Sequence, residues 1–401
     1  MVVLPREYGR RRLLHQIRRA GRVPRIELAH KTGMSRATVT TITAELLQAG
    51  LIEEIARPDT TPDTRRGRPR VDLKIRGGAH TIVGAKISCR QLSLVLLDFE
   101  GEELAELERQ LPAETFSPGQ LADLFADAVA ELARGAGLTA NEISGAGLGI
   151  AGVVQAAEGI VYWSPSLSER NVALGEILTR RLGRPVFIDN DANLVALAER
   201  SFGLGQSHSD FIVVTIESGV GMGIVLGGEL YRGTRGCGAE FGHTKVHLDG
   251  ALCRCGQRGC LEAYVADYAL LREAQSLPGD DPTAPPAMRI EALLDAARKG
   301  NATARSILDR AGRMFALGLA NLVNIFDPEL IILAGEQMQF DHLFADEVIA
   351  AMRTSIVQID KPPPDVVIHK WGNLMWAKGA AAYALDNVTE LALAGLNDNA
   401  A

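Results

Sequence analysis

The stretch CRCGQRGCLE (253–262) places three cysteines within eight positions and ends on an acidic residue. In a cytoplasmic protein thiols stay reduced, so a tight cysteine cluster more often holds a metal than forms disulfides. The glycines of this C-x-C-G-x-x-G-C pattern allow the unusual backbone angles of a tight metal loop. One imidazole with three thiolates suits a closed tetrahedral site, so we predict structural Zn²⁺ held by His243, Cys253, Cys255 and Cys260. The alternative is that the cysteines are buried as small hydrophobic side chains.

The same loop predicts where three polar side chains lie. Imidazole has two nitrogens, so His243 can bind the metal through one and donate a hydrogen bond to a ligand hydroxyl through the other. The metal loop would then position Glu262 beside Glu240. We therefore expect the loop to present His243 and Glu262 to a hydroxyl-rich ligand.

A second polar cluster, IDNDAN (188–193), follows a predicted strand and opens a predicted helix. The carboxyl end of a strand is where ligands bind in α/β sheets. Asp191 can orient or deprotonate a hydroxyl, and Asn190 offers both a donor and an acceptor to neighbouring hydroxyls. The alternative is a helix cap with a turn, a common use of these residue types.

The charge of the chain is divided between its two ends. The 401 residues are 47% hydrophobic and 23% charged, which is ordinary globular material with room for two or three domains. Residues 1–76 hold 17 Lys and Arg against 8 Asp and Glu, whereas the remainder is acidic and the whole chain carries −7. This asymmetry favours a polyanionic partner for the N-terminal end. The longest apolar runs are too short to cross a bilayer, so we expect a cytoplasmic protein without membrane insertion.

The basic end has helix-turn-helix spacing over RIELAHKTGMSRATVTTITAELLQAGLIEE (25–54). Gly33 allows the positive φ of the tight turn, and Ser35 can cap the next helix. The outward face of that helix suits entry into a major groove, where bases are read by hydrogen bonds and methyl contacts. The predicted DNA contacts here are Ser35, Arg36, Ala37, Thr38, Thr40 and Thr41. The alternative is an ordinary three-helix packing unit with a solvated threonine face.

A strand after Gly50 completes the pattern of a winged helix, and a basic linker is expected over 56–76. Within it, Arg66-Gly67-Arg68-Pro69 resembles the core of an AT-hook, in which arginines lie in a narrow minor groove. We therefore add Arg66 and Arg68 to the predicted DNA contacts. The alternative is a plain flexible linker.

Beyond residue 77 the chain alternates apolar strand runs with amphipathic helices, which is typical of α/β architecture. A similar order restarts after about residue 210, which predicts two lobes with a cleft between them. The expected domains are a winged helix-turn-helix with its linker (1–76), a first lobe (77–190 plus 375–401) and a second lobe with the zinc loop (191–374).

At these residues the chain resembles the ROK family of repressors, open reading frames and sugar kinases. CRCGQRGCLE matches the family's zinc signature, GAEFGH its Glu-x-x-His and IDNDAN its Asn-Asp. The resemblance implies a two-lobed actin-like, hexokinase-like fold of the ribonuclease H-like ATPase type. With the winged helix, the chain is similar to the xylose-repressor and N-acetylglucosamine-repressor branch. The sugar contacts that the resemblance implies are Asn190, Asp191, Glu240, His243 and Glu262.

The chain departs from the family's kinases where they bind nucleotide. Their Asp-x-Gly-Gly-Thr-Lys phosphate loop aligns with Lys86, Ser88, Cys89, Arg90 and Gln91, which leaves no carboxylate for magnesium. Glu217-Ser218-Gly219 replaces Gly-Thr-Gly in the second phosphate turn, and Glu336 stands where the kinases tend to have glycine. Added carboxylates repel a triphosphate, so we expect no enzyme activity.

The resulting hypothesis is a sugar-responsive transcriptional regulator, a repressor of carbohydrate-utilisation genes, whose operator affinity changes when sugar binds in the cleft. Its expected partners are operator DNA, a sugar effector and a second copy of the chain, as a homodimer or homotetramer. One alternative is an ATP-dependent sugar kinase with an accessory DNA-binding domain, since Asp191, the base expected of such a kinase, is present. A third is a regulator silenced by a partner protein.

Overall fold

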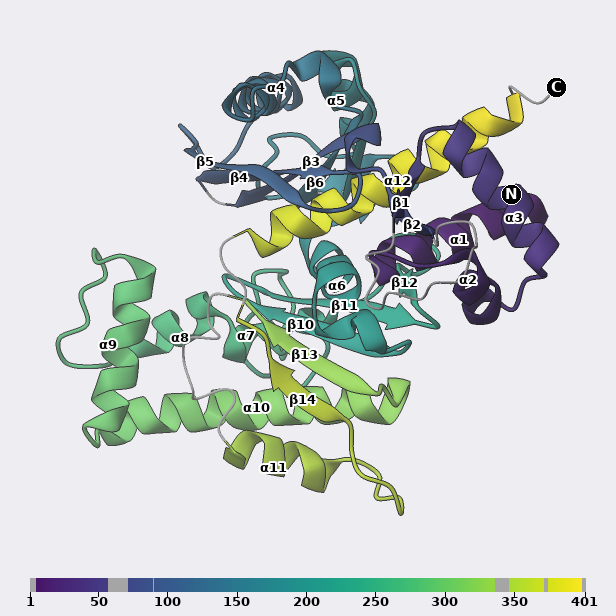
Figure 1. Cartoon of the computed structure of the whole chain (residues 1–401). Coiled ribbons are helices and arrows are strands. Elements are labelled where there is room, and N and C mark those ends of the chain that lie inside the picture. The colour runs from purple at the N-terminus through teal and green to yellow at the C-terminus, as the bar shows by residue number, and fades with distance from the viewer. Residues whose placement is uncertain (1–4, 57–70, 89, 336–345, 371–373, 399–401) are drawn as a thin grey trace. The chain divides into compact units, whose positions relative to one another are not determined.

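The computed structural model describes residues 5–56, 71–88, 90–335, 346–370 and 374–398 (Figure 1). Compact packing divides the chain into two units. The first contains Met1–Ile150, Ala157–Asp189 and Ala380–Ala401, and the second contains Ala151–Ala156 and Asn190–Gly379. The winged helix groups with the first lobe in this division.

The N-terminal part of the first unit is a winged helix. Its helices are α1 (Pro5–Ala20), α2 (Arg25–Thr32) and α3 (Arg36–Gln48), and its wing strands are β1 (Ile52–Ala56) and β2 (Val71–Ile75). Gly33 has a φ of 66° between α2 and α3, and the Ser35 hydroxyl accepts a hydrogen bond from the Thr38 amide, which confirms the predicted turn and cap.

The wing extends into the segment that was predicted as a linker. Strand β2 pairs antiparallel with β1, with Ile52 opposite Ile75. Residues 71–75 are therefore part of the DNA-binding fold, because Leu73 and Ile75 are buried and complete its core. Arg66 and Arg68 lie outside the described residues.

The rest of the first unit is built on a five-stranded sheet in the order β5-β4-β3-β6-β9. Its strands are β3 (Thr81–Ser88), β4 (Gln91–Asp98), β5 (Glu103–Gln110), β6 (Gly145–Ile150) and β9 (Val186–Asn190). Strands β3, β4 and β5 form an antiparallel meander, and β6 runs parallel to β3. Helices α4 (Pro118–Gly135) and α5 (Leu174–Leu182), strand β8 (Ile160–Trp163) and most of α12 (Met375–Asp398) complete this unit.

The second unit repeats this order in a sheet arranged β12-β11-β10-β13-β14. The strands are β10 (Phe211–Ile216), β11 (Val220–Leu226), β12 (Glu229–Tyr231), β13 (Leu330–Ala334) and β14 (Asp365–Ile368). The meander again comes first, and β13 runs parallel to β10. The repeated order confirms the α/β fold with two similar lobes.

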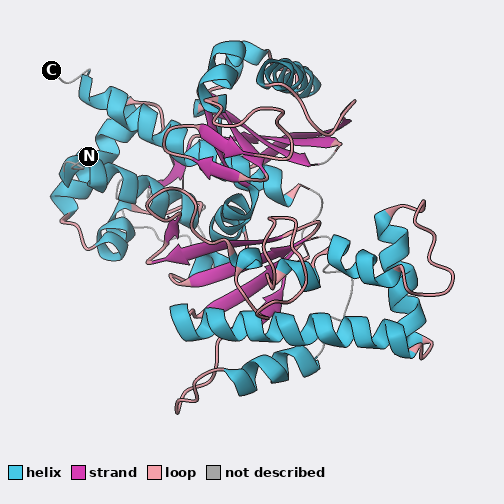
Figure 2. Cartoon of the chain, turned by 180° about the vertical axis from the view of Figure 1, so that it is seen from behind, coloured by secondary structure: helices cyan, strands magenta, loops and turns pink. Residues whose placement is uncertain are grey.

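Helices cover both faces of the second sheet, whose strands stand out in Figure 2. On one face, α10 (Ala302–Phe326) buries Phe315 and Leu319 against Ile212 and Ile331. On the other, α6 (Asp191–Phe202) packs Val195 against Val213 and Ile332. The remaining elements are β7 (Val153–Gln155), α7 (Glu262–Val265), α8 (Asp267–Ala274), α9 (Pro286–Arg298) and α11 (Asp346–Ser355).

One close approach of backbones holds the first unit together and can be tested. A Cβ atom added at Gly147 of β6 would lie 2.0 Å from the Ala380 carbonyl oxygen of α12. Gly147→Ala should therefore force the helix away from the sheet and lower the free energy of unfolding by about 1–3 kcal/mol. Urea unfolding would measure the loss.

The matched control is Gly135→Ala, because an added Cβ there meets nothing within 4 Å and the residue ends helix α4. Alanine should leave the stability unchanged or raise it by up to about 1 kcal/mol. Equal unfolding midpoints for the two variants would contradict the close packing of β6 on α12.

Candidate functional site

The predicted metal ligands converge on one point of the second unit. The ligand atoms of His243, Cys253, Cys255 and Cys260 all lie within 4.8 Å of one another. Cys255 Sγ lies 3.7 Å from Cys260 Sγ, and Cys253 Sγ lies 3.7 Å from His243 Nδ1. Ligands on zinc–sulfur bonds of about 2.3 Å lie about 3.8 Å apart at the corners of a tetrahedron. The spacing of the four side chains therefore fits tetrahedral coordination of an ion with bonds of this length.

Glycines and short backbone hydrogen bonds shape the loop that brings the cysteines together. Gly256 and Gly259 have φ angles of 86° and 77°, which other residues adopt with strain. A Cβ atom at Gly259 would also lie 1.8 Å from the His247 carbonyl oxygen. The Cys253 amide donates to the Gln257 carbonyl at 2.8 Å, which closes the turn between the first and last cysteines.

Burial and one neighbouring ammonium group influence the protonation of the cysteines. Burial raises the pKa of the Cys253 thiol to about 12, so this group stays protonated unless a positive charge stabilises the thiolate. Lys245 Nζ donates a hydrogen bond to Cys260 Sγ at 2.8 Å. This contact raises the pKa of Lys245. A bound metal would displace protons from the thiols, which links metal affinity to pH.

The two nitrogens of His243 face different partners. Nδ1 lies on the cysteine side, whereas Nε2 lies 3.9 Å from Glu240 Oε2. One ring nitrogen thus faces the cysteines and the other a carboxylate, and the predicted roles of the ring toward a metal and a sugar stay predictions. Both residues are partly exposed, with His243 38% and Glu240 49% accessible.

Glu262 is held more firmly, because it begins α7 two residues after the last cysteine. Its Oε2 accepts the Val220 amide at 3.3 Å, and its Oε1 accepts the Tyr268 hydroxyl at 3.3 Å. Tyr268 was not predicted, and no spacing or motif marks it. It reaches the site from α8 and stacks under Arg254, whose guanidinium carbon lies 4.0 Å from the ring centroid.

Three carboxylates gather at this site. Burial raises the pKa of Glu240, His243 lowers it, and Glu262 and Asp191 raise it again. Asp191 is the first residue of α6, directly after strand β9, as predicted. Such a group of acceptors beside an imidazole suits neutral ligands that carry several hydroxyl donors.

Asn190 serves as a helix cap in the structure. Its Oδ1 accepts the Ala192 amide at 2.9 Å, and its Nδ2 donates to the Gly152 carbonyl at 2.8 Å. The capping alternative therefore describes the hydrogen bonds of this side chain. Its predicted role toward a sugar stays a prediction.

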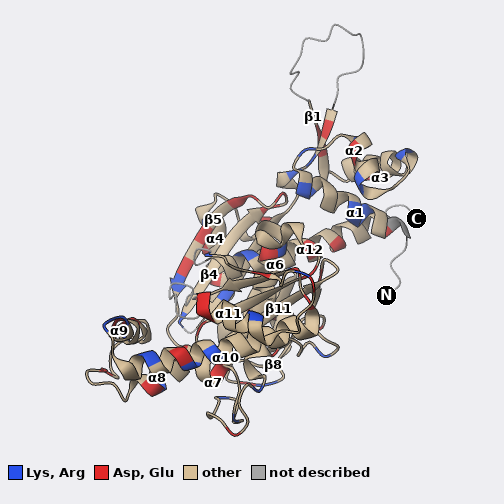
Figure 3. Cartoon of the chain, turned by 90° about the horizontal axis from the view of Figure 1, so that it is seen from below, with Lys and Arg blue, Asp and Glu red and all other residues tan. Residues whose placement is uncertain are grey.

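The second candidate site is the outward face of α3 in the winged helix. Arg36, Ala37, Thr38, Thr40 and Thr41 are all exposed there. Ser35 is engaged as the cap, and its hydroxyl also lies 2.9 Å from Thr38 Oγ1. The basic residues of α1 and the start of α3 are visible in Figure 3.

One buried ion pair and two further arginine hydrogen bonds fix the orientation of α3 in the winged helix. Arg10 of α1 is 3% exposed and donates to Glu45 of α3 at 2.8 Å. Arg25 of α2 donates to Thr43 of α3 at 3.2 Å and to Glu54 of the wing at 2.6 Å. These bonds join all three helices and the wing, so the recognition face is presented by a single packed body.

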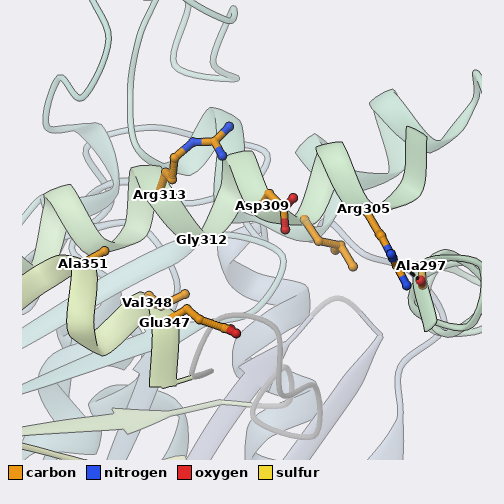
Figure 4. A pocket seen from close by; sticks show the side chains of 9 residues that line it. Ala297, Arg305, Asp309, Gly312, Arg313, Glu347, Val348 and Ala351 are labelled. Atoms are coloured by element: carbon orange, nitrogen blue, oxygen red, sulfur yellow. Dashed lines mark hydrogen bonds between the residues drawn. The ribbon is translucent and has the colours of Figure 1, made fainter. Parts of the chain in front are cut away.

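The second unit also contains a cavity of about 460 Å³ between α9, α10 and α11 (Figure 4). Apolar Leu308 and Val348 line it together with the charged side chains of Arg305, Asp309, Arg313 and Glu347. None of the predicted site residues lines this cavity. Among the described helices, none is long and apolar enough to cross a membrane.

The chain is similar to known proteins over both of these regions. The model of the ROK family matches residues 82–387, and that of a winged helix-turn-helix DNA-binding domain matches residues 10–53. The chain is 29% identical to a xylose repressor of Caldicellulosiruptor bescii over 338 residues, 81% of this chain and 82% of that protein. It is 32% identical to a glucokinase of Streptomyces coelicolor over 314 residues, 75% of this chain and 96% of that one.

A solved structure covers nearly the whole molecule. It is described as a ROK family transcriptional regulator homologous to an Escherichia coli protein, Mlc. It covers 98% of this chain and 99% of its own, with a TM-score of 0.82 and 25% sequence identity. Because the family model spans most of the sequence and this structure matches both parts of the fold, the chain belongs to the ROK family and carries an N-terminal winged helix-turn-helix.

Proposed function

We propose that this protein is a sugar-responsive transcriptional regulator, a cytoplasmic repressor that binds operator DNA through α3 of its winged helix. One observation carries the proposal. A single chain combines an exposed helix face of short hydroxyl side chains and an arginine with a cluster of carboxylates and an imidazole beside a loop whose four side chains could hold a metal. The similarity to a xylose repressor and to a ROK transcriptional regulator supports it.

The proposed effector is a sugar bound by Asn190, Asp191, Glu240, His243 and Glu262. The carboxylates would accept hydrogen bonds from hydroxyls, and His243 Nε2 would donate one. A structural Zn²⁺ held by His243, Cys253, Cys255 and Cys260 would fix the imidazole ring and the start of α7. Sugar binding would favour one arrangement of the chain by about 1–3 kcal/mol, which is the usual size of an allosteric coupling.

The operator would be read by a homodimer, with two α3 helices in successive major grooves. Arg36 is the group best suited to a bidentate contact with guanine, which is worth about 1–3 kcal/mol. Arg66 and Arg68 would add minor-groove contacts, as the sequence alone suggests.

DNA duplexes selected from a random library would test this function. The wild-type protein should select a palindromic sequence, and Arg36→Ala should weaken binding about tenfold or more and relax the preference at one base pair. Arg298→Ala, at an exposed arginine of α9 in the second unit, is the charge-matched control and should bind normally. Failure of the wild-type protein to select any sequence, with or without sugars, would refute the proposal.

A thermal-shift panel of sugars identifies the effector, because a ligand that binds only the folded protein raises its melting temperature. The sugar that does so should change operator affinity by about fivefold or more.

We also propose that the protein does not phosphorylate its sugar, although a glucokinase is among its relatives. The resemblance aligns the kinases' magnesium carboxylate with Lys86, which is buried in β3, and their second phosphate turn with Glu217. No ADP should be released from ATP with hexoses, hexosamines or pentoses. Turnover that Asp191→Asn abolishes would favour the kinase instead.

The metal assignment predicts the effect of Cys255→Ser. Cys255 is exposed, so serine at this position should leave the hydrophobic core intact while removing one of four ligands. The variant should lose bound zinc by elemental analysis and should lose its sugar response, yet still bind operator.

Cys237→Ser is the control, since Cys237 lies outside the cluster. It should retain both zinc and the sugar response. A full zinc content in the Cys255 variant would refute the assignment of the ligands.

A further inference from the structure

The winged helix is packed into the first unit rather than attached through a tether. Leu13, Leu14 and Ile17 of α1 share one hydrophobic core with Leu385 and Val388 of α12. All five side chains are at most 4% exposed. Figures 1 and 3 show α1 beside the C-terminal part of α12. The last turns of the chain are therefore part of the core of the DNA-binding body.

Arg18 of α1 lies at the centre of this contact. Its Nη2 donates to the Phe99 carbonyl at 3.3 Å and to Thr389 Oγ1 of α12 at 3.5 Å. Its guanidinium carbon lies 5.0 Å from the centroid of the Phe99 ring. One arginine thus contacts both α12 and the residue that follows β4.

The surroundings of Arg18 only partly compensate its charge. Burial lowers the pKa of its guanidinium, whereas Asp386 and Asp98 raise it. The Nε atom is buried and has no hydrogen-bond partner among the described residues. A half-buried cation in such surroundings contributes little to stability, because desolvation offsets its attraction to nearby carboxylates. Such a charge is better known for specifying how two elements pack against each other than for stabilising the fold.

An ion pair lies at the rim of the same contact. Arg11 Nε of α1 lies 3.1 Å from Glu390 Oε1 of α12, and both side chains are about half exposed. On the other side, Lys74 of the wing lies 2.7 Å from Glu100, just beyond β4. The polar contacts therefore surround the apolar core and determine one orientation of the winged helix on the first lobe.

We infer that Arg18 is a positioning residue for operator binding, which holds the winged helix in one orientation on α12 so that paired recognition helices keep a fixed separation. This inference rests on the proposed DNA-binding function. A dimer binds two half-sites only when its recognition helices are about one helical turn apart. A winged helix released from α12 would tolerate other separations, at a cost in affinity.

The test compares the duplex that the wild-type protein selects from the random library with one in which about 5 bp, half a helical turn, separate the half-sites further. The wild-type protein should prefer the selected spacing by about tenfold or more. Arg18→Glu places a carboxylate beside Asp386 and Asp98 and should reduce that preference to about threefold or less. Arg18→Glu with Asp386→Lys restores opposite charges and should recover the preference.

Arg19→Glu is the matched control, because it reverses the same charge at an exposed position of the same helix. It should weaken binding to both duplexes alike and keep the spacing preference. If circular dichroism shows that the Arg18 variant is unfolded, the test uses the exposed Arg11–Glu390 pair instead. Arg11→Glu should then loosen the preference, and Arg11→Glu with Glu390→Arg should restore it.

The inference would be overturned if the Arg18 variant, or the Arg11 variant when that pair is used, kept the spacing preference of the wild type. Operator binding by the wild-type protein would still support the proposed function in that case. A loss that the charge-restoring partner fails to repair would also overturn it, because the effect would then not depend on the pairing with α12. Absence of wild-type binding would instead refute the proposed function itself.

Discussion

The convergence of His243, Cys253, Cys255 and Cys260 is the constraint on which the candidate sugar site depends. The loop between them has little regular structure, and its glycine turns specify where the thiols point. The loop begins next to Glu240 and ends two residues before Glu262, so its shape fixes the distance between the two carboxylates. A short polar loop buries little apolar surface, so bonds to a metal would offset the conformational entropy that the loop loses when it becomes ordered.

The sequence predicted those parts of the molecule that depend on local chemistry. The cap at Ser35, the turn at Gly33 and the four metal ligands each follow from residue types at short spacing. The repeated order of strands followed from hydrophobic periodicity, because each lobe buries both faces of its sheet.

The contacts that the sequence did not predict all join different elements of the fold. Strand β2 was predicted as part of the linker because the basic residues before it obscured its short apolar pattern. Its pairing partner is β1, on the other side of the wing. Tyr268 reaches Glu262 from another helix, and Arg18 meets Thr389 across 371 positions. Residue types and hydrophobic periodicity do not record such pairs, since they arise from packing between elements.

The helix α12 connects these separate observations. Its first residues belong to the second unit, where a Cβ atom at Gly379 would lie 1.9 Å from the Leu194 carbonyl oxygen of α6. Helix α6 begins at Asp191, and the later residues of α12 pack against α1 in the first unit. The same helix therefore takes part in the packing behind the candidate sugar site and in the core of the winged helix. In a kinase of this fold, sugar-binding energy contributes to phosphoryl transfer; in a regulator it has to bias one packing arrangement over another. A helix that is tightly packed at both ends suits the second use, because close-packed contacts change between discrete arrangements rather than deforming gradually.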